Sequence, residues 1–294
     1  MDIQRRDFLK LAGLAATAGI LGPGGSRNAL GAEAEGFGLL IDTTKCVGCR
    51  SCEVACAEAN SLKEPERFGD ETIFDKVRTT SPDAFTVVNR YKTQKGQVFR
   101  KQQCMHCLQP ACESACLVRA LQKHPEGPVT WNGKKCLGCR YCMVSCPFDV
   151  PKFEYGSTNP RIRKCTLCFE RVRAGKQTAC AEACPMGAVQ FGKRSDLLES
   201  AKTRIYQNPD SYVHSVYGEH EAGGTSVMYL SAVPFEQLGL NTALDKEPYP
   251  KLTQEYLHNI VLVDLFFPIF LLGISYAVKG REKEIKAQMR EEER

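Results

Sequence analysis

The chain has 294 residues and a net charge of +5, and its composition excludes several classes of protein. Charged residues make up 25% of it and hydrophobic residues 43%, so most of the chain is neither disordered nor embedded in lipid. No long basic stripe is present, and a nucleic-acid partner is therefore not expected. Sixteen cysteines are far more than a chain of this length ordinarily carries, and they require disulfides, metal or both.

The N-terminus has the layout of an export signal. Arg5 and Arg6 precede an apolar run at residues 11–21 that is rich in alanine and glycine and too short to span a bilayer. A twin-arginine pair in this place is typical of a Tat signal, and small residues at 29–34 offer a cleavage site. We predict a Tat signal peptide over residues 1–34. A Sec signal or an ordinary amphipathic terminus is the alternative, but Sec delivers unfolded chains that cannot carry inserted clusters.

Four blocks of four cysteines account for all sixteen thiols, and the first block follows a strand signal at residues 39–41. In chain order the spacings are C-x2-C-x2-C-x3-C, C-x2-C-x4-C-x3-C, C-x2-C-x2-C-x3-C and C-x2-C-x11-C-x3-C. Proline directly follows the third and fourth blocks. The members are Cys46, Cys49, Cys52 and Cys56; Cys104, Cys107, Cys112 and Cys116; Cys136, Cys139, Cys142 and Cys146; and Cys165, Cys168, Cys180 and Cys184.

Short elements lie between the blocks. An insertion at residues 57–103 contains a predicted hairpin, whose strands at 85–91 and 97–101 flank a Lys95-Gly96 turn. Residues 128–131 are predicted to form a strand that runs into an Asn-Gly turn before the third block.

More regular structure is predicted after the fourth block. Residues 188–192 have the pattern of a strand, and Ser195 is a candidate N-cap for a helix over 196–205. Residues 206–255 are rich in glycine, proline and polar groups. We expect an irregular extension there, with one strand at 226–230.

An apolar run of nineteen residues at 260–278 lies near the C-terminus. As a helix it would be about 28 Å long, close to the thickness of the hydrocarbon core. Basic residues follow it, namely Lys279, Arg281, Lys283, Lys286, Arg290 and Arg294, whereas only Lys246 and Lys251 lie near its start. The positive-inside rule then places the C-terminus in the cytoplasm and the cysteine-rich body outside. We predict a transmembrane anchor over 256–279 and a basic tail over 280–294, with a buried core helix as the alternative.

The spacing of the blocks is typical of 4Fe–4S clusters. A cubane cluster needs thiolates at the corners of a tetrahedron, and the C-x2-C-x2-C loop supplies three of them. In two-cluster ferredoxins the fourth cysteine ligates the other cluster, so blocks come in pairs. Four blocks therefore predict an α+β fold of two tandem or interleaved bacterial-ferredoxin-like units with four 4Fe–4S clusters, plus one C-terminal transmembrane helix.

Two other uses of the cysteines are less consistent with this pattern. Disulfides are permitted outside the cytoplasm, but the short x2 spacings would give strained local bridges. Structural zinc uses C-x2-C pairs and rarely three cysteines in a row at this spacing.

The blocks and their flanking residues carry a family resemblance. Residues 36–240 resemble the iron–sulfur (beta) subunits of membrane-bound respiratory oxidoreductases, among them formate dehydrogenase, dimethyl sulfoxide reductase and the hydrogenase-2 type of nickel–iron hydrogenase. The segments that carry it are CVGCRSCEVAC, KQQCMHCLQPACESAC, CLGCRYCMVSCPFDVPKFEY, CTLCFERVRAGKQTACAEACP and YGEHEAGGTSVMYL. It implies a four-cluster ferredoxin-like domain over residues 35–205.

The resemblance also implies which cysteines share a cluster, because the family pairs block one with block four and block two with block three. The implied sets are Cys46, Cys49, Cys52 and Cys184; Cys165, Cys168, Cys180 and Cys56; Cys104, Cys107, Cys112 and Cys146; and Cys136, Cys139, Cys142 and Cys116. Leu117 stands where the family has proline after the last cysteine of block two, which leaves a different loop there open. No block lacks a cysteine, so no 3Fe–4S cluster is expected.

The resemblance further implies a function and partners. The chain would carry electrons, without catalysing a reaction itself, between a periplasmic catalytic subunit and an integral membrane subunit that reacts with quinone. A Tat signal, an anchor and the stretch AVPFEQLGL favour the hydrogenase-2 type, with the formate dehydrogenase or another molybdopterin-dependent type as the alternative. A cysteine-rich structural membrane anchor without redox function is the alternative from another class.

Several single residues have a structural and a functional interpretation. His106 is expected to pack structurally, because four thiolates already complete each cluster. His258 lies just before the apolar run at 260–278, where it could approach a partner's cofactor or quinone site or be an ordinary interfacial residue. Asp264 is a charge within the anchor, and Pro268 frees its carbonyl, so the pair could bind a partner helix or Asp264 could reach the interface. Basic residues next to the cysteines could raise cluster potentials, dock partners or be ordinary surface: Lys45, Arg50, Lys134, Lys135, Arg140 and Lys164.

Overall fold

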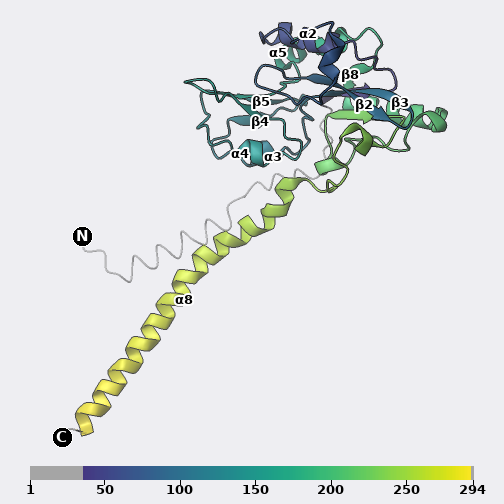
Figure 1. Ribbon diagram of the computed structural model, residues 1–294. Helices are drawn as coiled ribbons and strands as arrows, with labels where there is room; N and C mark the ends of the chain where they lie inside the picture. Colours follow the sequence, from purple (N-terminus) through teal and green to yellow (C-terminus); the bar gives the residue numbers. More distant parts are fainter. Residues whose placement is uncertain (1–35, 293–294) are drawn as a thin grey trace. The chain divides into compact units, whose positions relative to one another are not determined.

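The computed structural model describes residues 36–292 (Figure 1). Its largest sheet has three strands. The predicted signal peptide lies outside the described residues. The strand order is β8-β1-β9, with β1 at Phe37–Asp42, β8 at Val189–Lys193 and β9 at Val227–Leu230. β1 pairs antiparallel with β8 and parallel with β9. The strands predicted at 39–41, 188–192 and 226–230 are therefore present and share one sheet.

The central strand β1 is buried on both faces, and its residues alternate between two cores. Leu40 packs with Leu197 and Ala201 of helix α7 (Arg194–Gln207), which covers one face. Leu39 and Ile41 point to the other face, where the core includes thiol-bearing residues of the cysteine blocks. The sheet thus separates an ordinary hydrophobic core from a cysteine-lined one.

Helix α7 spans Arg194–Gln207 and begins two residues earlier than the sequence predicts. Its N-cap is Lys193, and Ser195 lies in the first turn, where its hydroxyl donates to Asp196 Oδ1 (3.0 Å). The prediction of Ser195 as N-cap was wrong because strand β8 runs straight into the helix. The Arg194 N–H donates to the Gly36 carbonyl, and its guanidinium is buried against backbone carbonyls.

The predicted hairpin in the insertion is present as β2 (Val87–Thr93) and β3 (Gly96–Gln102). Thr93 pairs with Gly96, so the two-residue turn is Gln94-Lys95 and not Lys95-Gly96. Gly96 instead occupies the first position of the returning strand, with φ of +100°. The insertion also holds the 3-10 turn Glu71–Phe74.

A second region is built from small elements around its own core. Hairpin β4–β5 joins Leu121–Lys123 to Val129–Trp131, and β6–β7 joins Lys152–Phe153 to Ile162–Arg163. Its buried core contains Leu121, Val129 and Ile162 together with two cysteines, Cys112 and Cys142. The remaining short helices are α2 (Ser51–Ala59), α3 (Ala111–Ser114), α4 (Tyr141–Val144), α5 (Phe169–Arg173) and α6 (Ala179–Glu182).

The segment after α7 consists of 3-10 turns around strand β9. The turns are Pro209–Ser211, Glu221–Gly223 and Phe235–Leu238. Because β9 is the parallel neighbour of β1 and is fully buried, this segment completes the central sheet.

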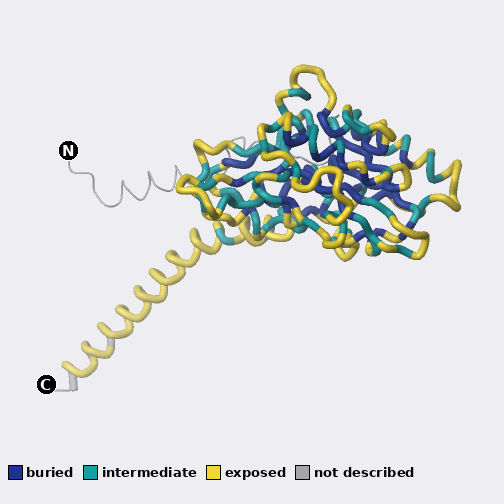
Figure 2. Tube along the Cα trace, turned by 45° about the horizontal axis from the view of Figure 1, so that its top comes forward, coloured by how far each residue is buried: buried dark blue, intermediate teal, exposed yellow. Residues whose placement is uncertain are grey.

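The chain ends in α8 (Tyr249–Glu292), one continuous helix with Pro268 inside it. It is the one described helix that is long and apolar enough to cross a membrane, and its apolar window has no buried residue (Figure 2). Side chains such as Phe266 and Leu272 are exposed, at 61% and 69%. Asp264 is exposed on the same helix. A buried core helix, the alternative to an anchor, is inconsistent with this exposure.

Replacing Leu40 with alanine tests the sheet–helix core. Leu40 is fully buried between the sheet and α7, so Leu40→Ala should lower the free energy of unfolding by about 2–5 kcal/mol. The measurement is the urea midpoint followed by circular dichroism. Leu117→Ala is the control, because Leu117 is 88% exposed and its truncation should change the free energy by less than about 0.5 kcal/mol. Equal effects of the two changes would contradict this packing.

Candidate functional site: four cysteine quartets

The fold brings together cysteines that are far apart in sequence. One cavity is lined by four cysteines from blocks one and four, and a second cavity by four others from the same blocks. We name these quartet I, which is Cys46, Cys49, Cys52 and Cys184, and quartet II, which is Cys56, Cys165, Cys168 and Cys180.

Blocks two and three form two further groups, as the electrostatic neighbours of their thiols indicate. The thiols that raise the pKa of Cys107 by electrostatic repulsion are Cys104, Cys146 and Cys112. The thiols that raise the pKa of Cys142 in the same way are Cys136, Cys116 and Cys139. We name the groups quartet III, which is Cys104, Cys107, Cys112 and Cys146, and quartet IV, which is Cys116, Cys136, Cys139 and Cys142.

Strand pairing assembles two of the quartets. In the antiparallel pair β1–β8, Ile41 faces Val189, so the loop after β1 and the turn before β8 lie at the same end. That end holds Cys46 and Cys184. The hairpin β4–β5 does the same for quartet IV, because Cys116 precedes β4 and Cys136 follows β5.

In each of the four blocks, the first C-x2-C loop bends at the residue directly before its second cysteine, which has a left-handed backbone conformation. These residues are Gly48 (φ +76°), His106 (+47°), Gly138 (+70°) and Leu167 (+53°). The bend turns backbone N–H groups toward sulfur: Gly138 N–H donates to Cys136 Sγ and Leu167 N–H to Cys165 Sγ, both at 3.4 Å. A left-handed conformation is unfavourable for leucine and histidine, so the surrounding fold must hold it in place.

The turn after the last cysteine of blocks two, three and four is also shared. Arg119, Asp149 and Gly187 each lie three residues on, have φ near +50° to +59°, and donate an N–H to the cysteine carbonyl. Leu117 does not alter this turn, although the sequence left a different loop open. In block two the next N–H, of Ala120, donates to Cys116 Sγ at 3.1 Å.

All sixteen cysteines are free thiols, and most are sheltered from water. Burial raises the pKa of the Cys112 and Cys165 thiols to about 12 and that of Cys142 to about 11. These thiols would therefore stay protonated at neutral pH unless a metal displaced their protons. No cysteine forms a disulfide, which was one of the alternatives.

A single metal ion does not match the quartets. Four thiolates around one zinc at about 2.3 Å would bring their sulfur atoms within about 3.8 Å of each other. Among residues 36–292, no three histidine, cysteine or acidic side chains converge closely enough to hold one ion. The thiols of quartets I and II instead line cavities, which suits a polynuclear group better than one zinc ion.

A buried ammonium group supports the same conclusion. Lys101 lies on β3, is 1% exposed, and its Nζ has no hydrogen-bond partner among the described residues. Burial by itself lowers the pKa of Lys101, but four surrounding thiols, three from quartet II and one from quartet I, outweigh it and raise that pKa. An unpaired buried cation is costly, so this position requires nearby negative charge. Anionic iron–sulfur clusters bound by the quartets would supply it.

Lys164 and His106 are buried beside the quartets as well. Lys164 Nζ donates to the carbonyls of Val129 and Cys165 and lies 3.7 Å from Cys104 Sγ. His106 Nδ1 accepts from the Val129 N–H (2.9 Å), which places the ring proton on Nε2. Burial lowers the pKa of His106 well below its usual value, so the ring is neutral and packs structurally.

The other basic residues next to cysteines have different surroundings. Lys45, Lys134 and Lys135 are exposed, in keeping with ordinary solvated surface. Arg140 is exposed and its guanidinium stacks on Phe153, 5.4 Å from the ring centroid.

Arg50 belongs to a buried ion-pair network that fixes helix α2. Its guanidinium contacts Glu53 at 2.9 Å, and Arg78 contacts the same carboxylate at 2.6 Å. Glu53 also accepts the N–H of Val88 on strand β2 (2.6 Å). The network therefore ties the helix that carries Cys52 and Cys56 to the hairpin of the insertion.

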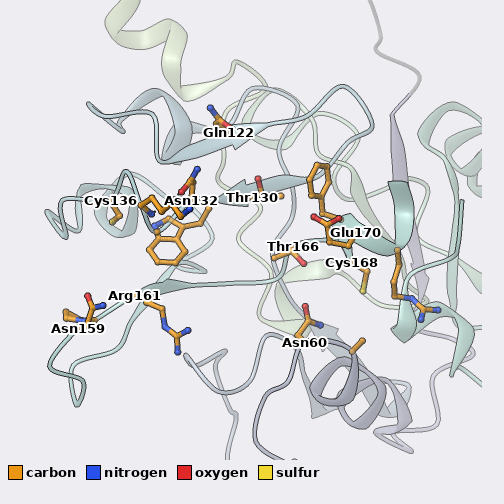
Figure 3. A pocket seen from close by; sticks show the side chains of 17 residues that line it. Asn60, Gln122, Thr130, Asn132, Cys136, Asn159, Arg161, Thr166, Cys168 and Glu170 are labelled. Carbon is orange, nitrogen blue, oxygen red and sulfur yellow. Dashed lines mark hydrogen bonds between the residues drawn. The ribbon is translucent and has the colours of Figure 1, made fainter. Parts of the chain in front are cut away.

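A wide cleft runs between the elements that carry quartets II and IV, with a volume of about 940 Å³ (Figure 3). Cys168 lies on one wall, and Cys136 with Asn132 on another. Its polar side chains come from five different segments, among them those of Arg161 and Glu170, and no triad of nucleophile, base and acid is assembled by the described residues around it.

Comparison with known proteins agrees with this geometry. Residues 96–194 match the family described as the 4Fe–4S dicluster domain. The hydrogenase-2 operon protein HybA of Escherichia coli O157:H7 is 37% identical over 96% of this chain and 96% of its own length. A protein of Nitratidesulfovibrio vulgaris is 47% identical over 97% of this chain and 80% of its own length. The nitrate-inducible formate dehydrogenase iron–sulfur subunit of Escherichia coli K12 is 37% identical over 65% of this chain and 66% of its own.

The folded cysteine blocks and the domain match define a ferredoxin-like iron–sulfur protein with mixed helices and strands. Within that class, the chain belongs to the family of the HybA iron–sulfur proteins, to which the iron–sulfur subunits of formate dehydrogenase are related. The resemblance drawn from the motifs is thereby confirmed.

Removing the Glu53 carboxylate tests whether the ion-pair network positions α2. Glu53→Ala leaves Arg50 buried without its partner, at a cost of about 3–5 kcal/mol. We expect faster bleaching of the visible iron–sulfur absorption on mild heating. Glu58→Ala, on the exposed side of the same helix, is the matched control and should bleach at the normal rate. Indistinguishable rates for both variants would contradict a positioning role.

Proposed function

We propose that the chain transfers electrons through four 4Fe–4S clusters, one in each quartet, and catalyses no reaction itself. The observation that carries this proposal is the grouping of all sixteen thiols into four quartets, each of which draws on two different blocks. The ligand sets are the ones that the resemblance implies. Each cluster would take and release one electron.

The quartets follow one another in a row, which supports a single path. Cys180 of quartet II is close enough to raise the pKa of Cys52 in quartet I electrostatically, and Cys104 of quartet III does the same to Cys165 in quartet II. Cys142 of quartet IV in turn acts on Cys112 of quartet III. Electrons would therefore pass in the order I, II, III and IV, or in reverse.

The two ends of this row are the places suited to exchange with partners. Cys49 in quartet I and Cys139 in quartet IV are the exposed cysteines. Apolar side chains are exposed beside each, Val47 at 54% and Leu137 at 73%. Partner subunits that cover these side chains would bring their own redox centres close to the end clusters.

We propose the nickel–iron hydrogenase type as the complex, with a catalytic subunit at one end and an integral quinone-reacting subunit at the other. The HybA relative matches over 96% of this chain, whereas the formate dehydrogenase relative matches over 65% of it. A formate dehydrogenase or another molybdopterin-dependent complex is the second candidate.

The same proposal includes a place in the cell. The signal over residues 1–34 would export the folded chain by the Tat route, and α8 would anchor it with its basic end in the cytoplasm. The quartets would then lie on the periplasmic side of the inner membrane. The proposed domains are those predicted from the sequence, namely 35–205 for the clusters, 206–255 for the extension, 256–279 for the anchor and 280–294 for the tail.

Metal analysis of the anaerobically purified chain tests the function. We expect about sixteen irons and sixteen acid-labile sulfides per chain. Cys139→Ser removes a ligand of quartet IV alone, so it should lower iron to about twelve or change one electron paramagnetic resonance (EPR) signal and leave three. A colourless chain without sulfide would instead identify a structural anchor. Polypeptides that co-purify in mild detergent would separate the hydrogenase type from the formate dehydrogenase type.

Replacing Asp264 tests whether α8 binds a partner helix. A carboxylate within the apolar run costs about 2.5–3.5 kcal/mol near the bilayer centre, which a polar partner would offset. If Asp264 pairs with the integral subunit, Asp264→Leu should reduce co-purification of that subunit while the chain stays in the membrane fraction. Leu265→Ala, one position along, is the control. Unchanged co-purification would show that Asp264 reaches the interface alone.

A further inference from the structure

Two buried lysines occupy the junctions between neighbouring quartets. Lys101 lines the cavity of quartet I and also that of quartet II, so it lies between them. Lys164 bonds the carbonyl of Cys165 in quartet II (3.0 Å) and approaches the sulfur of Cys104 in quartet III (3.7 Å). Each ammonium group therefore serves two quartets at once.

Neither lysine is neutralised by a carboxylate in the described part of the chain. Lys101 Nζ has no hydrogen-bond partner there, and Lys164 Nζ has carbonyl oxygens and one sulfur. Arg50 differs from both, because its buried guanidinium is paired with the carboxylate of Glu53. The two lysines are thus placed for negative charge that the protein itself does not supply.

The backbone fixes both positions. On β3, Lys101 faces Val88 of the neighbouring strand, and its carbonyl accepts the hydroxyl of buried Tyr229 (2.8 Å). Lys164 comes directly after strand β7 and directly before Cys165. Because Lys101 lies on an ordered strand and Lys164 directly follows one, the backbone holds both residues in place beside the quartets.

We propose that Lys101 and Lys164 are built-in counter-cations that raise the reduction potentials of the clusters on either side of each junction. This inference rests on the proposed function, because it requires a cluster in each quartet. A cluster with four thiolate ligands is an anion that gains one negative charge on reduction. A fixed cation nearby favours the reduced form, and burial strengthens the effect because water screens it less.

The positions of the two lysines predict which clusters should change potential when each lysine is replaced. Quartet II faces both lysines, quartet I faces Lys101, and quartet III faces Lys164. The groups that act on Cys142 in quartet IV are other thiols and a backbone N–H, with no lysine among them. Quartet IV therefore serves as an internal reference.

The experiment is a redox titration of the full-length protein in detergent, followed by EPR spectroscopy. In Lys101→Met two of the four signals should move to lower potential, and in Lys164→Met two should move, one of them shared. The double variant should move three signals, and the shared one furthest. We expect at least a tenfold change in the ratio of reduced to oxidised cluster at fixed potential, which is about 59 mV for one electron.

Control variants distinguish the effect of the lysine charge from that of the lysine shape. A separate measurement tests the proposed function independently of the two lysines. Lys92→Met, on the exposed side of the same hairpin, should move nothing. Lys101→Arg and Lys164→Arg keep the charge and should retain the original potentials. The signal that never moves should be the one altered in Cys139→Ser. Iron and sulfide content of the unaltered chain tests the proposed function independently.

Other outcomes are also decisive. Fully loaded methionine variants with unmoved potentials, or with all four signals moved equally, would overturn the inference. Iron loss in the methionine variants but not in the arginine variants would support it, because charge is then required to hold adjacent anions together. Iron loss in the arginine variants too would overturn it, because the site would then need the shape of lysine and not its charge.

Discussion

The exchange of cysteines between blocks governs how the cysteine-rich part of the chain folds. Each three-cysteine loop is completed by a thiol from another block, so no block can form a quartet by itself. Quartet I brings together Cys46 and Cys184, which are separated by more than half of the described sequence. Quartet II likewise brings together Cys56 and Cys165. Whatever binds the thiols therefore also closes long loops, which makes binding and folding one event.

The helices and strands between the cysteine loops are short, and they hold these loops in position. Several helices have four or five residues and would not be stable alone. They persist because hairpins and the central sheet fix their ends. Antiparallel pairing explains why a block that ends before one strand meets a block that begins after its partner, as in β1–β8 and β4–β5. The thiol-lined cores are thus by-products of ordinary strand register.

The sequence predicted what local spacing controls. The blocks, the strands at 39–41 and 188–192 and the apolar helix were all visible in it, because each depends on neighbours within a few residues. The parallel pairing of β9 with β1 was not, since residues nearly two hundred positions apart decide it. The start of α7 was misplaced for a similar reason, because a tertiary contact of Arg194 outweighs the capping preference of Ser195.

Lys101 shows most clearly what spacing cannot reveal. It lies in a stretch that reads Arg-Lys-Gln on a hairpin strand, which by composition alone resembles a solvated edge. Lys164 was noticed because it adjoins a cysteine, whereas Lys101 is three residues from one, and both are buried. A lysine buried without a carboxylate would destabilise an ordinary core. Its presence between two thiol-lined cavities is therefore evidence about the charge of what those cavities hold, and it makes the cation part of the site and not of the scaffold.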